Sequence, residues 1–197
     1  HLSYSGAISA SQNFAIVDCI KDRSSRFVFN EKFMSWPCVI IFYNKVLTKD
    51  ENMTKKVIVA GVGMIPFKKP GASENYNVMG EKAARAALED AGLDYKLVQQ
   101  AYVGYVYGDS TAGQAALYGV GLSGIPIFNV NNYCSTGSSA LFLARQAVQS
   151  GTIDCAIALG FEQMTPGALD ILFEDRPNPL MRFYDERTSL QGFDESV

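Results

Sequence analysis

Histidine is almost missing from this chain of 197 residues, which contains a single one, His1. Because histidine is the usual acid–base partner of a nucleophile, its scarcity leaves covalent catalysis here without an obvious base. Cysteine is also scarce: Cys19, Cys38, Cys134 and Cys155 form no CxxC pair and no zinc spacing. We therefore expect no metal site and no disulfide framework, and the cysteine usage indicates a reducing compartment.

Neither charge nor hydrophobicity is concentrated enough for a nucleic-acid surface or a membrane span. The net charge is −3 and the pI is near 5.2, which argues against electrostatic binding of nucleic acid. A membrane span needs roughly 18 apolar residues, and the nearest run, 33–47, is broken by Pro37, Asn44 and Lys45. The opening residues lack the basic region of a signal peptide, and the chain ends in Asp-Glu-Ser-Val without a Ser-Lys-Leu address.

The chain changes character near residue 53. Residues 1–52 show no clear period, and although Val39 to Tyr43 could pair as a strand, no neighbouring segment completes a sheet. Met53, followed closely by an apolar strand, looks like a natural start. We therefore interpret residues 1–52 as a leader or extension that contributes little to the fold, while a genuine extension packed on the domain remains the alternative.

Strands and helices alternate from residue 57 onward. Short apolar runs predict strands at 57–62, 101–107, 125–130 and 155–160. Helical spacing predicts helices at 78–91, 114–120 and 138–150, each followed by a glycine. The residues after 165 are typical of a loop with weak helix. This alternation predicts an α/β fold with a mostly parallel sheet covered on both faces.

Two competing motifs fail on the residues that they require. Gly61-Val62-Gly63 follows a strand as in a dinucleotide fingerprint, but Pro66 stands where the third glycine is needed. A tight turn that closes the strand is the better interpretation. Ser135 lacks the flanking glycines of a serine-hydrolase elbow.

The most informative stretch runs from Asn131 to Ala140 and reads Asn-Asn-Tyr-Cys-Ser-Thr-Gly-Ser-Ser-Ala. It puts Cys134 where an apolar strand runs into a helix. Unpaired N–H groups and the positive end of the helix dipole favour the thiolate there, and the thiolate is the nucleophile. The pattern predicts covalent catalysis through Cys134, with a small buried hydrophobe at a tight turn as the alternative. Cys155, at the start of a buried strand, is expected in the core.

The segments around Cys134 resemble the thiolase superfamily, most of all the thiolase domain of the sterol carrier protein X type. The resemblance covers residues 57 to about 164, and its pieces occur in the family's order. They include residues 59–64, 103–111, 124–132, 140–146 and 158–164.

The resemblance implies a role for Cys134 and a reaction. Cys134 would take the acyl group, and its backbone N–H would help to form an oxyanion hole. The implied reaction is thiolytic cleavage of a β-ketoacyl-CoA, branched-chain or sterol-derived, with coenzyme A as co-substrate and no covalently bound cofactor. The resemblance also implies a homodimer. It implies a role in lipid metabolism in the peroxisome, with the cytoplasm as the alternative location.

The same resemblance implies that the chain is incomplete as a catalyst. Residues 53–197 would form a partial thiolase N-terminal domain, an incomplete βαβαβαβ half, with 165–197 starting a loop region. The family's histidines and second cysteine come from a C-terminal half, so the isolated chain is expected to be inactive. The alternatives are a non-catalytic truncated isoform that binds full-length thiolase and a ketoacyl-synthase-like condensing enzyme. Lys68 and Lys69 are expected to be solvated or to contact a coenzyme phosphate, and Glu162 to form structural hydrogen bonds.

Overall fold

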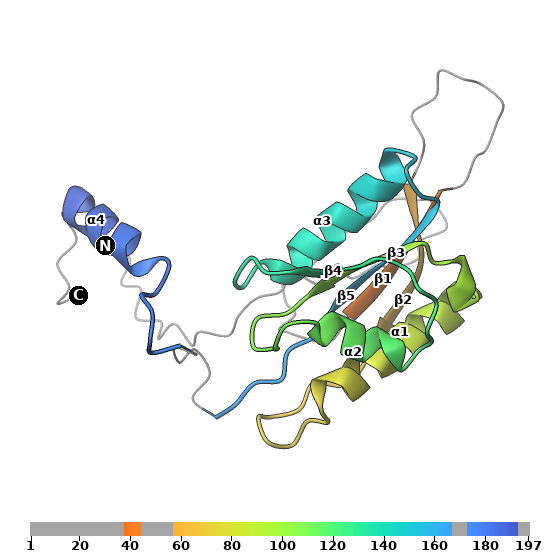
Figure 1. The fold of residues 1–197 in the computed structure, drawn as a ribbon, viewed down its shortest axis with the longest axis horizontal. Helices are drawn as coiled ribbons and strands as arrows, with labels where there is room; N and C mark the ends of the chain where they lie inside the picture. Colours follow the sequence, from red (N-terminus) through yellow and green to blue (C-terminus); the bar gives the residue numbers. More distant parts are fainter. Residues whose placement is uncertain (1–37, 45–56, 167–172, 193–197) are drawn as a thin grey trace, which may run out of the picture. The chain divides into compact units, whose positions relative to one another are not determined.

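One five-stranded sheet organises the first of two units in the computed structural model, which describes residues 38–44, 57–166 and 173–192 (Figure 1). The units are residues 1–166 and 167–197. The strands of the first unit are β1 Cys38–Asn44, β2 Val57–Met64, β3 Gln100–Gly104, β4 Ile127–Val130 and β5 Cys155–Gly160. Its helices are α1 Tyr76–Ala91, the short 3₁₀ turn η1 Tyr95–Leu97, α2 Ala112–Tyr118 and α3 Thr136–Gln149.

The strand order is β2-β1-β5-β3-β4, and four of the five strands point the same way. β3 pairs in parallel with both β4 and β5, whereas β1 runs antiparallel to both β2 and β5. The predicted α/β class with a mostly parallel sheet is therefore confirmed. The predicted helices and strands from residue 57 onward all form, with shifted ends, and Gly92 ends α1 in the left-handed region at φ +63°.

The prediction that residues 1–52 contribute little to the fold is wrong for residues 38–44. These residues form β1, an interior strand of the sheet with Val39 and Ile41 fully buried. One partner is β2, the next strand along the chain, but the other is β5, which starts at Cys155, so local patterns could not reveal that β1 is an interior strand. The rest of residues 1–52 lies outside the described residues, and the domain boundary at residue 53 stays a prediction.

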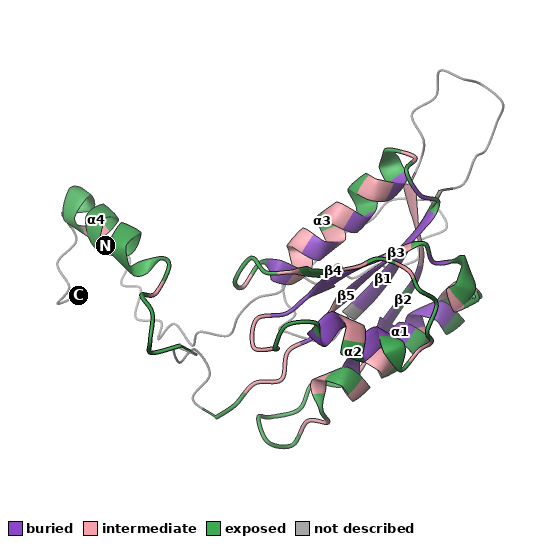
Figure 2. Cartoon of the chain, viewed as in Figure 1, coloured by how far each residue is buried: buried purple, intermediate pink, exposed green. Residues whose placement is uncertain are grey.

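The sheet separates two layers of buried side chains. Figure 2 shows that the buried residues lie in the strands and on the helices that cover them. One layer packs beneath α1 and α2 and contains Val39, Ile41, Val103 and Leu159. The other packs beneath α3 and contains Ile40, Phe42, Tyr102 and Ala158, so neighbouring strand residues enter opposite layers as the pleat requires. Burial on both faces explains why these strands read as nearly continuous apolar runs.

Gly61 and Gly63 lie inside β2, so the prediction of a tight turn at this pair is wrong. A methyl group added at Gly61 would lie 2.5 Å from the carbonyl oxygen of Ala87, and one at Gly63 would also meet the backbone of α1. The two glycines therefore let α1 pack directly on the strand. Pro66 in place of a third glycine already argues against a dinucleotide site. The close packing of α1 on β2 explains why glycine stands at positions 61 and 63.

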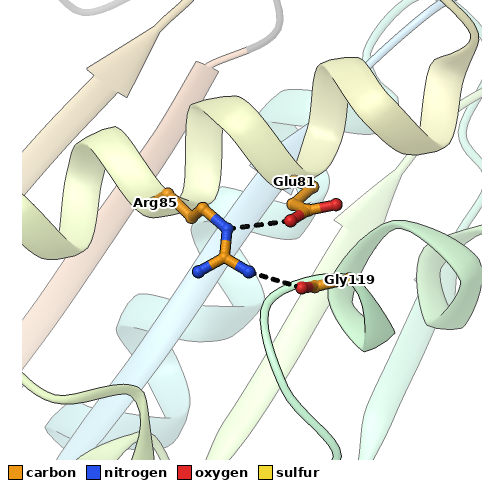
Figure 3. Close-up of polar contacts among 3 residues, drawn as sticks. All are labelled: Glu81, Arg85 and Gly119. Carbon is orange, nitrogen blue, oxygen red and sulfur yellow. Dashed lines mark hydrogen bonds and ion pairs between the residues drawn. The ribbon is translucent and has the colours of Figure 1, made fainter.

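An arginine bridge joins α1 to the end of α2 (Figure 3). The Nε of Arg85 donates to the carboxylate of Glu81 at 2.8 Å, and its Nη2 donates to the carbonyl of Gly119 at 2.6 Å. Gly119 caps the C-terminus of α2, where backbone carbonyls lack helical partners. The bridge satisfies one of these carbonyls.

The second unit contains the helix α4 Met181–Gln191, which carries mostly exposed side chains. Gly192 follows it in the left-handed region, and an ion pair joins Arg182 to Glu186 one turn later. The expected weak helix after residue 165 is thus present.

Candidate active site around Cys134

Cys134 lies just beyond the carboxyl end of β4. In the sheet register the final residues of β3, β4 and β5 are neighbours: Gly104 is paired with both Val130 and Gly160. Ligand sites in α/β sheets form at this edge, outside the carboxyl ends of the strands. The turn that carries Cys134 therefore occupies the edge where such folds perform chemistry.

Thr136, the first residue of α3, holds this turn together. Its side chain is fully buried, and its hydroxyl donates to the carbonyl of Val130 at 2.8 Å. The same oxygen accepts the backbone N–H of Asn132 at 2.7 Å. One hydroxyl thus ties the last residue of β4 and the first part of the turn to the start of α3, with Cys134 inside the loop that it closes.

Three further side chains close the turn from outside. The hydroxyl of Ser135 donates to the carbonyl of Asn132 at 2.8 Å, and the Asn132 amide donates to the Ser139 hydroxyl at 2.8 Å. The Ser139 hydroxyl in turn donates to the carbonyl of Ser135. These bonds link the turn to the first turn of α3 and limit how far the Cys134 backbone can move.

Tyr133, directly before Cys134, has a left-handed backbone with φ 51°. This conformation costs a tyrosine residue roughly 1–3 kcal/mol, and residues strained in this way are often found at active sites. The strained residue lets the chain reverse between β4 and α3. As a result, the following thiol sits at the junction and remains partly exposed.

Gly104 allows α3 to approach the end of β3. A methyl group at Gly104 would lie 2.7 Å from the carbonyl oxygen of Thr136 and 2.9 Å from its Cγ2 atom. The absence of a side chain at this strand end therefore lets the first residue of α3, the buried Thr136, pack against the end of β3.

The second described thiol, Cys155, is in a different environment. It begins β5, is 1% exposed, and burial raises the pKa of its thiol to about 11, with Asp154 adding to the shift. The prediction that Cys155 belongs to the core is confirmed. Cys134 is half-buried and sits outside both core layers.

Glu162 fastens the loop that follows β3 at the same edge of the sheet. Its carboxylate accepts the backbone N–H of Val106 at 2.8 Å and that of Tyr107 at 3.0 Å. Burial raises the pKa of Glu162, and the backbone N–H donors oppose that shift. The expected hydrogen-bonding role of Glu162 is confirmed.

Comparison with known proteins identifies the family. The model of the thiolase N-terminal domain matches residues 57–172. The chain belongs to the thiolase family. Sterol carrier protein 2 of Gallus gallus is 55% identical over 130 residues, covering 65% of this chain and 24% of that protein. The benzoylsuccinyl-CoA thiolase subunit BbsB of Thauera aromatica is 39% identical over 116 residues, covering 57% and 29%.

The thiolase match covers only part of the relatives' length. The chain spans about a quarter of the sterol carrier proteins that it matches. Among solved structures, 3-oxoacyl-[acyl-carrier-protein] synthase III of Aquifex aeolicus VF5 aligns with a TM-score of 0.44 at 21% identity, covering 49% of this chain and 32% of that protein.

Other residues of interest lie away from the thiol of this thiolase chain. Lys68 and Lys69 are exposed on the loop after β2, which is the edge strand farthest from β4 in the strand order. The amide of Gln114 donates to the carbonyl of Ile127 and accepts from Asn129, which fastens α2 to β4. In the described part of the chain, no cluster of three His, Cys, Asp or Glu residues could hold a metal, and no helix is long and apolar enough to cross a membrane.

Sequence reasoning missed the residues that position the thiolase turn. Thr136 reads as an ordinary helix-start residue, and its two hydrogen-bond partners become visible only when β4 and α3 are placed together. Tyr133 carries no local signal for a left-handed backbone, since glycine or asparagine is usual there. The three Ser and Thr residues in the run Cys-Ser-Thr-Gly-Ser were the available hint, because short hydroxyl side chains often bond to nearby backbone.

Proposed function

We propose that this chain carries the acyl-accepting nucleophile of a thiolase, Cys134, which acts on β-ketoacyl-CoA substrates with coenzyme A as co-substrate. Support comes from one observation above all. Cys134 is the partly exposed thiol at the carboxyl edge of the parallel strands, in a turn that Thr136 holds by two hydrogen bonds. A fixed, accessible thiol at a strand–helix junction suits covalent catalysis.

The proposed chemistry has two steps. The Cys134 thiolate attacks the β-carbonyl carbon, and the bond between the α- and β-carbons breaks. The released CoA-ester enolate takes up a proton, and the remaining acyl group stays on sulfur as a thioester. The thiol of free coenzyme A then takes that acyl group and returns the Cys134 thiol.

The proposed substrate class is based on the relatives that the chain matches. The matched relatives include a sterol carrier protein and a thiolase of a CoA thioester. On the sterol carrier relatives we propose branched-chain or sterol-derived acyl-CoAs as substrates and a place in peroxisomal lipid β-oxidation. A homodimer is also proposed: within the described residues, β4 is the last strand of the sheet, and the exposed ring of Phe128 lies on it.

The isolated chain is proposed to acylate once but not to turn over. Its only histidine, His1, lies outside the described residues, and the side chains bonded within the Cys134 turn are hydroxyls and amides. These groups are poor bases at neutral pH. A positioned acid–base group typically contributes about 10²–10⁴-fold to rate, so its lack should reduce turnover to background.

The test combines acylation with turnover. The chain is incubated with acetoacetyl-CoA or an activated acyl thioester, and the modified cysteine is located by peptide mass spectrometry. We expect one acyl group on Cys134, none in Cys134→Ala, and an unchanged yield in the matched variant Cys155→Ala. Acylation at another cysteine, or none at all, would overturn the nucleophile assignment.

Turnover is then measured with free coenzyme A present. We expect no product beyond one equivalent per chain. Several equivalents that disappear in Cys134→Ala would show that the chain contains its own base, and would overturn the proposal that it is inactive alone.

A further inference from the structure

β1 lies outside the segment that matches the thiolase family, yet it occupies an interior position in the sheet. The family match begins at residue 57, whereas β1 ends at Asn44. β1 pairs on one side with β2 and on the other with β5, both of which belong to the matched segment. A strand from outside the family region therefore joins two parts of the family region.

The matched residues alone leave the sheet in two pieces. Because β2 and β5 are both antiparallel to β1, they point in the same direction and do not pair with each other. With strands spaced about 4.8 Å apart, removal of β1 leaves a gap of one strand between them. Both edges of that gap would expose unpaired N–H and C=O groups, which favour the addition of another strand.

We infer that the gap between β2 and β5 is a strand-acceptor site, and that residues 38–44 of the same chain fill it by β-strand addition. The site selects an antiparallel segment of about seven residues, with apolar side chains on both faces. β1 meets this requirement closely. Val39 and Ile41 enter the layer beneath α1 and α2, while Ile40 and Phe42 enter the layer beneath α3.

The register shows how specifically the strand fits. Residues 38–43 pair with β5 without interruption, from Cys38 opposite Gly160 to Tyr43 opposite Cys155. On the other side, the pairing with β2 contains one irregularity after Ile41, at which Ala60 is left without a partner. A slip by one residue would send each apolar side chain to the opposite layer, so the acceptor site fixes the register.

The inference is independent of the Cys134 chemistry, and a disulfide tests it in the full chain. Tyr43→Cys, made in a Cys38→Ser background, places a thiol directly opposite Cys155. Opposed residues in antiparallel strands have Cβ atoms about 4.5–5.5 Å apart, close to disulfide geometry. Diamide would accept the two electrons and two protons released as the S–S bond forms. The matched control is Phe42→Cys, whose thiol enters the other layer opposite Ala156.

The products separate the possible occupants. A monomer with a 43–155 disulfide, and no such bond in the Phe42→Cys control, supports filling by the same chain. A dimer in which a 43–155 disulfide joins two chains would overturn the inference by showing that a second copy supplies the strand. Equal or absent cross-linking at both positions would overturn it as well, because β1 would then not lie in the acceptor site.

A second experiment opens the site. In the Ile41→Pro variant of the 197-residue chain, the proline removes a backbone N–H in the middle of an interior strand and should displace β1. A fluorescent peptide of residues 37–45, with serine at Cys38, should then bind with 1:1 stoichiometry. The wild-type chain, whose tethered β1 has a high effective concentration, should bind it at least tenfold more weakly.

The matched control peptide carries the same proline at Ile41 and should not bind either protein. Equal binding of the unmodified peptide to wild type and variant would overturn the inference, since it would indicate a different surface. If the variant aggregates, the disulfide experiment decides alone.

Discussion

Cys134 and Cys155, the two thiols that the structure describes, lie at opposite ends of the parallel strands, and the two ends are built differently. At the carboxyl end, Cys134 stands in a turn held by hydroxyl-to-backbone hydrogen bonds and preceded by a strained residue. At the amino end, Cys155 is enclosed, and the side chain of Gln99 accepts the backbone N–H groups of Asp154 and Cys155 at 2.6 and 3.1 Å.

The difference between the two ends shows where the fold leaves a cysteine side chain accessible. At the amino end, polar bonds join the chain segment before β3 to the start of β5, and the thiol points into the core. At the carboxyl end, the bonds organise a turn around a thiol that stays partly exposed. The same residue type is therefore buried at one end and partly exposed at the other, and each prediction below tests that contrast.

The largest expected effect is a difference in thiol reactivity. With the Cys155 pKa at about 11, about one Cys155 thiol in 1000 is ionised at pH 8, and burial blocks access to that fraction. Iodoacetamide should therefore label Cys134 at least ~100-fold faster than Cys155 in the folded chain. Peptide mass spectrometry over time measures both rates, and labelling in urea provides the control in which they converge. Faster labelling of Cys155 in the folded chain would contradict the contrast.

The sequence predicted most of this contrast because its signals were local. The run from Cys155 to Gly160 is continuously apolar, as a strand buried on both faces must be, and β5 has those bounds. Cys134 was predicted at a strand–helix junction because an apolar run precedes it and a helical pattern follows. Both placements needed only neighbouring residues.

What the sequence could not predict depends on distant partners. β1 was recognised as a possible strand, but its partners are β2 and β5, the second more than 100 residues away. The role of Gly61 depends on the backbone of α1 and that of Gly104 on Thr136, neither of which is adjacent in sequence. These contacts follow from packing, which no periodicity encodes.

Thr136→Val should destabilise the Cys134 turn at the carboxyl end of the strands and leave the Cys155 end unaffected. Valine fills the same volume but leaves the N–H of Asn132 and the carbonyl of Val130 without their buried partner, which should cost about 1–3 kcal/mol in the free energy of unfolding. Denaturant unfolding measures that loss. Acylation of Cys134 should slow as well, because the turn is no longer fixed.

The matched variant for this position is Thr136→Ser, which keeps the hydroxyl. It should restore most of the acylation rate while recovering only part of the stability, since the methyl group packed near Gly104 is lost. If Thr136→Val acylates as fast as wild type, the hydroxyl does not position the thiol.

Gln99→Ala should weaken the amino end without affecting Cys134. It removes the oxygen that accepts two backbone N–H groups, but Gln99 is exposed, so water replaces part of the interaction and the loss should be about 0.5–1.5 kcal/mol. Acylation of Cys134 should be unchanged under conditions where the chain is folded. A rate change as large as that of Thr136→Val would show that the two ends are not independent.

The smallest expected effect is a pH dependence from Glu162 at the carboxyl end. Because burial raises its pKa above the ordinary value of 4.5, the folded chain holds this proton more tightly than the unfolded chain. The tighter binding of this proton adds to the free energy of unfolding. That addition is complete below pH 4.5 and is lost as the pH rises through the raised pKa of Glu162. Glu162→Gln does not titrate, so the stability of wild type relative to this variant should fall as the pH rises. Urea unfolding across a pH series measures the difference, with Glu89→Gln on the exposed face of α1 as the control. A relative stability that is flat, or that rises with pH, would mean that the two backbone N–H donors outweigh burial and hold Glu162 as a carboxylate.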